Sequence, residues 1–157
     1  MAKRNIVFQG DPILSKKSRK VENFDERLYQ LLDDMKETLI DQNGVGLAAP
    51  QVGVLRRVVI IMEHEDGDVI ELINPEIIET SGRQENVEGC LSCPGEYGIT
   101  LRPMKVKVKA YDRYGKEHIY TGEELLARAF CHEIDHLDGI LFKEHVIRML
   151  DDSELEN

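Results

Sequence analysis

The chain has 157 residues, of which 41% are hydrophobic and 32% are charged, and its formal net charge is −10. This length suits one domain with one hydrophobic core over residues 1–157, and the acidic balance argues against general binding to nucleic acid or to anionic membranes. No apolar run is long enough to span a membrane, and residues 1–10 lack the apolar core of a signal peptide. We therefore expect a cytoplasmic protein.

The first predicted element is a helix over residues 24–41. Its apolar side chains recur at helical spacing and would form one buried face. Asn23 and Glu26 predict a capping box at its start, and Gly44 follows as a stop signal.

The middle of the chain predicts strands separated by turns. Strand-like segments, recognised by apolar content or by strict alternation, cover residues 57–62, 69–73, 105–111 and 117–120, and Ile77 and Ile78 are assigned to a further strand. Exposed turns are predicted at residues 63–68 and 112–115.

A second helix is predicted to open at Thr121, with Glu124 as its capping-box partner, and to end near Gly139. Residues 141–150 predict a further helical piece, and the acidic tail, residues 151–157, is expected to fray. The pattern indicates an α+β fold in which antiparallel strands pack around a central helix.

This second helix carries an H-E-x-x-H motif at residues 132–136. His132 and His136 are four residues apart, so they project from one helix face and can share one metal ion. Glu133 between them can then serve as the general base. For the motif alone, the alternative is an exposed polar helix face.

A catalytic metal usually takes three protein ligands, so a third must come from elsewhere. The downstream and scattered candidates are weak, because they are apolar, terminal or typical of solvated surfaces: Phe142, Glu156, His145, His64 and His118. Upstream, Cys90 lies in the stretch E-G-C-L-S and could present a thiolate. A small buried hydrophobe is the alternative that spacing leaves open.

The chain has three cysteines, Cys90, Cys93 and Cys131, which do not suggest a disulfide framework. Cys90 and Cys93 form a C-x-x-C pair that could be half of a zinc site or a redox pair of the thioredoxin type. No second C-x-x-C completes a zinc site, and Pro94-Gly95 follows where the redox motif needs a helix. Both interpretations are therefore disfavoured.

A third block, Gly44–Gln51, joins the first helix to the first predicted strand. Its small residues allow close backbone approach, and Gln51 adds a neutral amide donor beside that backbone. A tight connection with an incidental glutamine is the alternative.

Together, the blocks Gly44–Gln51, Glu88–Ser92 and His132–His136 closely resemble the peptide deformylase family, whose pattern they match at every motif position. The resemblance implies hydrolysis of the N-formyl group from the N-terminal formyl-methionine of newly synthesised bacterial polypeptides, with release of formate.

The resemblance also implies the roles of individual residues. Cys90, His132 and His136 would hold the metal and Glu133 would be the catalytic acid and base. Gln51 and the backbone N–H of Leu91 would donate hydrogen bonds to the carbonyl oxygen. The implied native metal is Fe²⁺, with Ni²⁺, Co²⁺ or Zn²⁺ able to substitute, although one thiolate with two imidazoles also suits zinc.

The methionine side chain needs an apolar slot, whose candidate residues are Val45, Leu125, Ala129 and the His132 ring. Plain core packing is a rival interpretation for the first three. The peptide backbone could add as a strand beside residues 44–46 and 89–91, which would bring Gly46 and Gly89 into contact with substrate.

The chain departs from the usual family pattern at three positions. Cys131 replaces a common glutamine, Cys93 replaces an aliphatic residue, and Arg128 stands where some relatives have an apolar pocket residue. We also expect Glu88 and Arg102 to form an ion pair that braces the cysteine loop. Two unrelated surface charges are the alternative.

The expected partners are N-formyl-methionyl nascent peptides, with transient ribosome contact as a further candidate and no nucleic acid or membrane partner. Some family members dock on the ribosome through a basic C-terminal helix, whereas this tail is short and acidic. We expect a monomer. The competing functions are a metalloprotease or amidohydrolase of other specificity and a catalytically silent binding protein.

Overall fold

The computed structural model describes residues 3–62 and 68–155. Its helices are α1 (Glu26–Asp41), α2 (Leu125–Leu137) and α3 (Asp152–Leu155), with short 3-10 helices η1 (Pro12–Ser15), η2 (Ala49–Val52) and η3 (Phe142–His145). The strands are β1 (Gly46–Ala48), β2 (Val58–Met62), β3 (Val69–Ser81), β4 (Gln84–Cys90), β5 (Cys93–Arg102), β6 (Lys105–Tyr111), β7 (Glu117–Glu123) and β8 (Val146–Met149). None of the helices among the described residues is long and apolar enough to cross a membrane.

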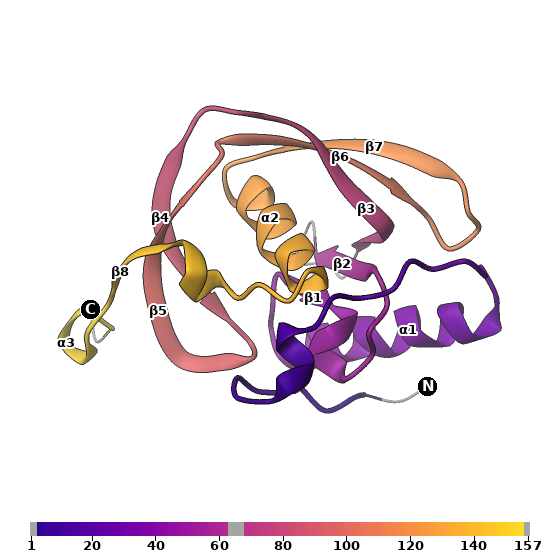
Figure 1. Ribbon diagram of the computed structural model, residues 1–157, viewed down its shortest axis with the longest axis horizontal. Helices are drawn as coiled ribbons and strands as arrows, with labels where there is room; N and C mark the ends of the chain where they lie inside the picture. The colour runs from indigo at the N-terminus through magenta and orange to yellow at the C-terminus, as the bar shows by residue number, and fades with distance from the viewer. Residues whose placement is uncertain (1–2, 63–67, 156–157) are drawn as a thin grey trace.

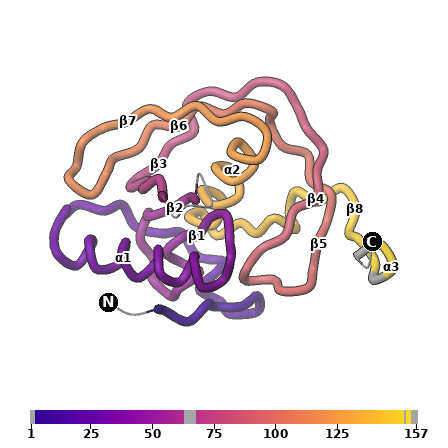
Figure 2. The backbone as a smooth tube through the Cα atoms, turned by 180° about the vertical axis from the view of Figure 1, so that it is seen from behind, coloured from indigo at the N-terminus to yellow at the C-terminus, as the bar shows by residue number. Residues whose placement is uncertain are grey.

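The strands form two antiparallel sheets, one with order β1-β2-β3-β6-β7 and one with order β4-β5-β8. Helix α2 lies between them (Figure 1), in contact with strands of both. Seen from behind, the β4–β5 hairpin rises beside α2 (Figure 2), and β8 pairs along the β5 edge. The predicted α+β fold with antiparallel strands around a central helix is confirmed.

Strand β2 is apolar throughout because both of its faces are covered. Val59 and Ile61 pack in the core that α2 forms with the larger sheet. Val58 and Ile60 point the other way, into the core that α1 forms with the same sheet. Successive side chains of a strand alternate between its faces, so a continuous apolar run is what a helix on each side requires.

Several strand predictions need correction. Ile77 and Ile78 lie in β3 itself and not in a further strand, because β3 continues past a register irregularity between Ile73 and Glu76. Strands β4 and β5 were not predicted. The predicted turn at residues 63–68 falls, except for Asp68, outside the described residues.

Both predicted capping boxes are wrong. Helix α1 begins at Glu26, and the carboxylate of Asp25 accepts a hydrogen bond from the Leu28 N–H at 3.2 Å, so Asn23 is not its cap. Thr121 belongs to β7, whose ladder with β6 continues to Glu123, and α2 begins only at Leu125. Pairing between strands therefore occupies the backbone that the proposed cap would have used.

The helical piece predicted over residues 141–150 is only partly correct, because it is a short 3-10 helix followed by a strand. Residues 141–150 hold η3 and strand β8, which adds to the open edge of β5. The following turn, α3, is tied down because Arg148 pairs with Glu154 at 2.8 Å and Asp151 accepts a hydrogen bond from the Glu154 N–H. These contacts join α3 to β8, and the fraying expected for residues 151–157 stays a prediction.

Candidate metal centre

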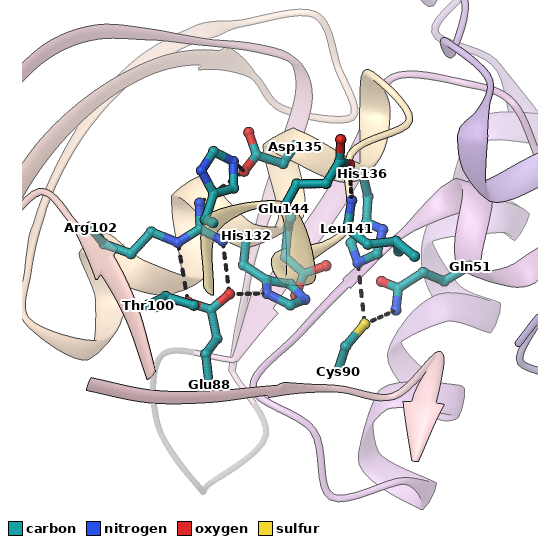
Figure 3. A network of polar contacts seen from close by, with 12 residues as sticks. Gln51, Glu88, Cys90, Thr100, Arg102, His132, Asp135, His136, Leu141 and Glu144 are labelled. Atoms are coloured by element: carbon teal, nitrogen blue, oxygen red, sulfur yellow. Dashed lines mark hydrogen bonds and ion pairs between the residues drawn. The ribbon is translucent and has the colours of Figure 1, made fainter. Parts of the chain in front are cut away.

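The three predicted metal ligands come together. Helix α2 buries His132 and His136 on one face, and Cys90 ends strand β4 beside them (Figure 3). Ligand atoms of the three side chains all lie within 4.8 Å of one another. The Cys90 Sγ is 3.3 Å from the His136 Nε2. The sulfur at the end of β4 and the two imidazoles of α2 therefore converge. The H-E-x-x-H spacing predicted the two histidines, and the family resemblance implied the cysteine.

Glu88 fixes the orientation of the His132 ring. Its Oε2 lies 2.6 Å from His132 Nδ1. Burial opposes the charged carboxylate, but hydrogen bonds from His132 and Arg102 outweigh it and lower the pKa of Glu88 to about 2. An ionised carboxylate accepts a proton donated by Nδ1, which leaves the Nε2 lone pair for a metal.

The ion pair expected between Glu88 and Arg102 is present and is buried. Arg102 Nη2 lies 2.8 Å from Glu88 Oε2, and its Nη1 lies 2.8 Å from Asp135 Oδ2. Thr100 donates a further hydrogen bond to Glu88 at 2.9 Å, and His145 Nε2 lies 3.1 Å from Asp135. Sequence reasoning missed the second half of this network, although Asp135 stands inside the H-E-x-D-H motif.

The residues fit a metal ion. Glu133 Oε1 is a buried side-chain atom that has no hydrogen-bond partner in the described part of the chain, and His136 turns its Nε2 toward the Cys90 sulfur. Burial, and then the nearby His132, lower the pKa of His136 well below its usual value, so its ring is neutral, as ligation requires. The Cys93 thiol and burial raise the pKa of the Cys90 thiol in the protein alone, and a coordinated cation would deprotonate it.

Glu133 lies directly over Gly46 of β1. A Cβ added at Gly46 would stand 2.8 Å from the Glu133 Cγ and 2.9 Å from its Oε2, so only glycine leaves room for this carboxylate. Burial raises the pKa of Glu133 to about 7, against the opposing charge of His132. A carboxylate that gains and loses a proton near neutrality suits general acid and base catalysis.

Gln51 is held in one orientation by its neighbours. Its Oε1 accepts a hydrogen bond from the Ala48 N–H at 3.0 Å. Its Nε2 lies 3.2 Å from Ser92 Oγ and 3.5 Å from Cys90 Sγ. The Gln51 amide is thereby directed at the ligand sulfur (Figure 3). Leu91 stands in the turn between β4 and β5 and packs against the α1 core.

The predicted substrate contacts fall in different environments. Val45 and Leu125 are 41% and 53% exposed, so each offers free apolar surface, whereas Ala129 is buried in the core of α2 and the larger sheet. Gly46 and Gly89 lie on β1 and β4, which are edge strands of their sheets. Each of these strands has a partner strand on one side only.

The structure also places two of the residues that depart from the usual family pattern, Arg128 and Cys131. Arg128 donates to Gln84 Oε1 at 2.7 Å, which directs its charge toward β4. Cys131 is buried, and burial raises the pKa of its thiol to about 11.

The sequence model of the family described as polypeptide deformylase matches residues 3–151. The chain belongs to the polypeptide deformylase family. The peptide deformylase of Caldicellulosiruptor bescii is 58% identical over 99% of this chain and 93% of its own length. That of Acetivibrio thermocellus is also 58% identical, over 99% of this chain and 91% of its own length.

Solved polypeptide deformylases share the fold. The crystal structure of a peptide deformylase from Legionella pneumophila has a TM-score of 0.88 and 44% identity, and covers 97% of this chain and 88% of its own. That of the Thermotoga maritima peptide deformylase has a TM-score of 0.88 and 36% identity, covering 92% and 97%. As a polypeptide deformylase family member, the chain is a hydrolase that removes the N-formyl group from the N-terminal formyl-methionine of newly synthesised polypeptides.

Proposed function

We propose that Cys90, His132 and His136 hold one divalent metal ion and that the formyl group of the substrate is hydrolysed beside it. The single observation that supports this most is the convergence of the three ligand atoms within 4.8 Å next to the unpaired, buried Glu133 Oε1. The native metal is Fe²⁺ by family resemblance, and Ni²⁺, Co²⁺ or Zn²⁺ can occupy the same ligands.

When bound, the metal supplies Lewis-acid polarisation and makes water more acidic. Glu133 takes the proton from the attacking water, holds it at a carboxylate oxygen and gives it to the departing amine nitrogen. Gln51 Nε2 and the Leu91 N–H donate hydrogen bonds to the formyl oxygen as negative charge develops on it. Such donors are effective because the protein already holds them in place, and losing one typically costs about 100-fold in rate.

The substrate peptide binds as an added strand along the edges of β1 and β4, beside Gly46 and Gly89. Its methionine side chain enters an apolar slot made by Val45, Leu125, Ala129 and the His132 ring. A formyl carbon carries only a hydrogen, so the space around it can be tight enough to exclude acetyl groups and internal peptide bonds.

Residues 1–157 act as one catalytic domain, as a monomer in the cytoplasm. The enzyme meets its substrates as nascent chains leave the ribosome, and the ribosome itself is a second, transient partner. The net charge of −10 supports the absence of general nucleic acid binding.

Anaerobic purification, metal analysis and a formate-release assay test this proposal together. The enzyme should contain about one metal ion per chain and release formate from a formyl-methionyl peptide, but leave the acetylated peptide intact. Comparable cleavage of the acetylated peptide would favour an amidohydrolase of broader specificity.

A pair of variants separates metal binding from proton transfer. Glu133→Ala should keep the metal and lose turnover by at least about 100-fold, because a general acid and base contributes that much. Cys90→Ala should lose the metal as well. Unchanged formate release by Glu133→Ala would refute the role given to that carboxylate.

A further inference from the structure

A second cysteine faces the proposed metal ligand across the turn of the β4–β5 hairpin. Cys90 and Cys93 are Cα partners at its end, with Leu91 and Ser92 as the connecting residues. Directly opposed residues of antiparallel strands have Cα atoms about 4.5–5.5 Å apart. Disulfide-bonded cysteines have Cα atoms about 4.4–6.8 Å apart, so the spacing typical of such partners lies within the range for a disulfide. The register irregularity between Gly89 and Cys90 leaves this pairing of the two cysteines in place.

The two thiols differ in exposure. Cys93 is 1% exposed, whereas Cys90 is half-buried. A small oxidant from solution therefore reaches the Cys90 sulfur before the buried Cys93 sulfur. The third cysteine, Cys131, is buried on α2, in a different element from the hairpin.

We propose that Cys93 is a resolving thiol for Cys90, so that peroxide oxidation of the centre ends in a reversible Cys90–Cys93 disulfide. This inference rests on the proposed function, in which Cys90 is the metal ligand. The C-x-x-C pair then has a redox role without the helix that a thioredoxin-type site needs, because the tight hairpin turn brings the thiols together.

The chemistry needs only hydrogen peroxide as co-reactant. The Cys90 thiolate attacks one peroxide oxygen, the O–O bond breaks and hydroxide leaves, which gives a sulfenic acid. The Cys93 sulfur then attacks the Cys90 sulfur, and water leaves with the sulfenic oxygen and the Cys93 proton. Overall, two thiols lose two hydrogens and peroxide is reduced to water.

The disulfide has two consequences for the enzyme. Its Cys90 sulfur is no longer a thiolate, so the metal loses one of three ligands and activity stops. The bond also protects Cys90 from further oxidation to sulfinic or sulfonic acid, which reductants do not reverse. A dithiol reductant exchanges with the disulfide, restores both thiols and lets the metal rebind.

Intact-mass measurement tests the inference on the metal-loaded enzyme, on Cys93→Val and on Cys131→Ala as the matched control. Valine keeps position 93 apolar and similar in volume. Each protein is treated with peroxide, analysed without reductant, then incubated with dithiothreitol and Fe²⁺ and assayed for formate release. The wild type and the Cys131 control should lose the mass of two hydrogens and regain most of their activity. Cys93→Val should gain two or three oxygens and stay inactive.

Two results would overturn the inference: oxygen gain without hydrogen loss in the wild type, or equal recovery of activity in Cys93→Val. Failure of the proposed function looks different. In that case the untreated wild type would lack either the metal or formate release, whatever the mass of the oxidised protein. The mass readout is thus independent of catalysis.

Discussion

The two sheets carry oppositely charged pairs in contrasting surroundings. Beside α2, Arg102 and Glu88 lie 2.8 Å apart with side chains only 4% and 8% exposed. On the larger sheet, Lys107 and Glu79 lie 3.2 Å apart with side chains 41% and 68% exposed. The first pair is shielded from water on all sides, while the second can exchange its partner for water at any time.

The difference in burial decides how much each ion pair contributes to stability. A buried charge that loses its partner cannot be hydrated, so breaking a buried pair typically costs about 3–5 kcal/mol. An exposed pair contributes about 0–1 kcal/mol, because water and salt replace the partner. The Arg102–Glu88 pair therefore positions a ligand, whereas the Lys107–Glu79 pair contributes little to holding the larger sheet together.

The largest expected effect is that of Arg102→Met. It leaves the carboxylates of Glu88 and Asp135 close together without their cation, and should lower the free energy of unfolding by about 3–5 kcal/mol. Urea denaturation measures this. The double variant Glu88→Gln, Arg102→Met should recover part of the loss, since one stranded charge is gone. No recovery would mean that packing, and not charge, dominates the change.

Glu88→Gln should act on the metal more than on the fold. The amide fills the same space but accepts a weaker hydrogen bond from His132 Nδ1 than a carboxylate does. Metal affinity should fall by about 10- to 100-fold, as measured by competition with a chelator. The matched control is Glu85→Gln, on the exposed face of the same strand, for which no change is expected. Equal affinities for both variants would contradict the role of Glu88.

Lys107→Met tests the exposed side of the comparison. We expect a change of less than about 1 kcal/mol in the free energy of unfolding, and less at high salt. A loss as large as that of Arg102→Met would erase the distinction between the two regions.

The smallest expected effect concerns pH at the β6–β7 turn. Slight burial opposes the charge of Asp112, but hydrogen bonds from His118 and from the backbone N–H groups of Lys116 and Tyr114 outweigh it and lower its pKa below 3.8. The stabilisation is therefore present above about pH 4 and is lost as pH falls through the lower folded-state value. Asp112→Asn should differ from the wild type in thermal unfolding at pH 6, and this difference should shrink below pH 4.

The elements that could be predicted from the sequence are those whose structure follows from the spacing of neighbouring residues. The spacing of His132 and His136 places both on one face of any helix, and the alternation in residues 105–111 requires a strand with one solvated side. The run at residues 57–62 was assigned to a buried strand for its apolar content, and the helix on each side explains that content.

The parts that sequence reasoning missed depend on tertiary contacts. Strand β4 is rich in Gln, Glu, Asn and Gly, which have weak strand propensity, and it forms because β5 pairs with it. The predicted helix cap at Thr121 was wrong for a similar reason, because Thr121 pairs with β6 as part of strand β7. Contacts such as Glu88 with His132, or Asp135 with His145, join separate elements and leave no periodic signal.

The order of the ligands along the chain has a consequence for how the molecule matures. Cys90 and His136 are separated by 46 positions and belong to a hairpin and a helix that must dock before their side chains meet. Such distant contacts form late, because a long loop has to close first. Metal content per chain should therefore report the completed docking of hairpin and helix, and so the fraction of a preparation that has reached its final tertiary arrangement.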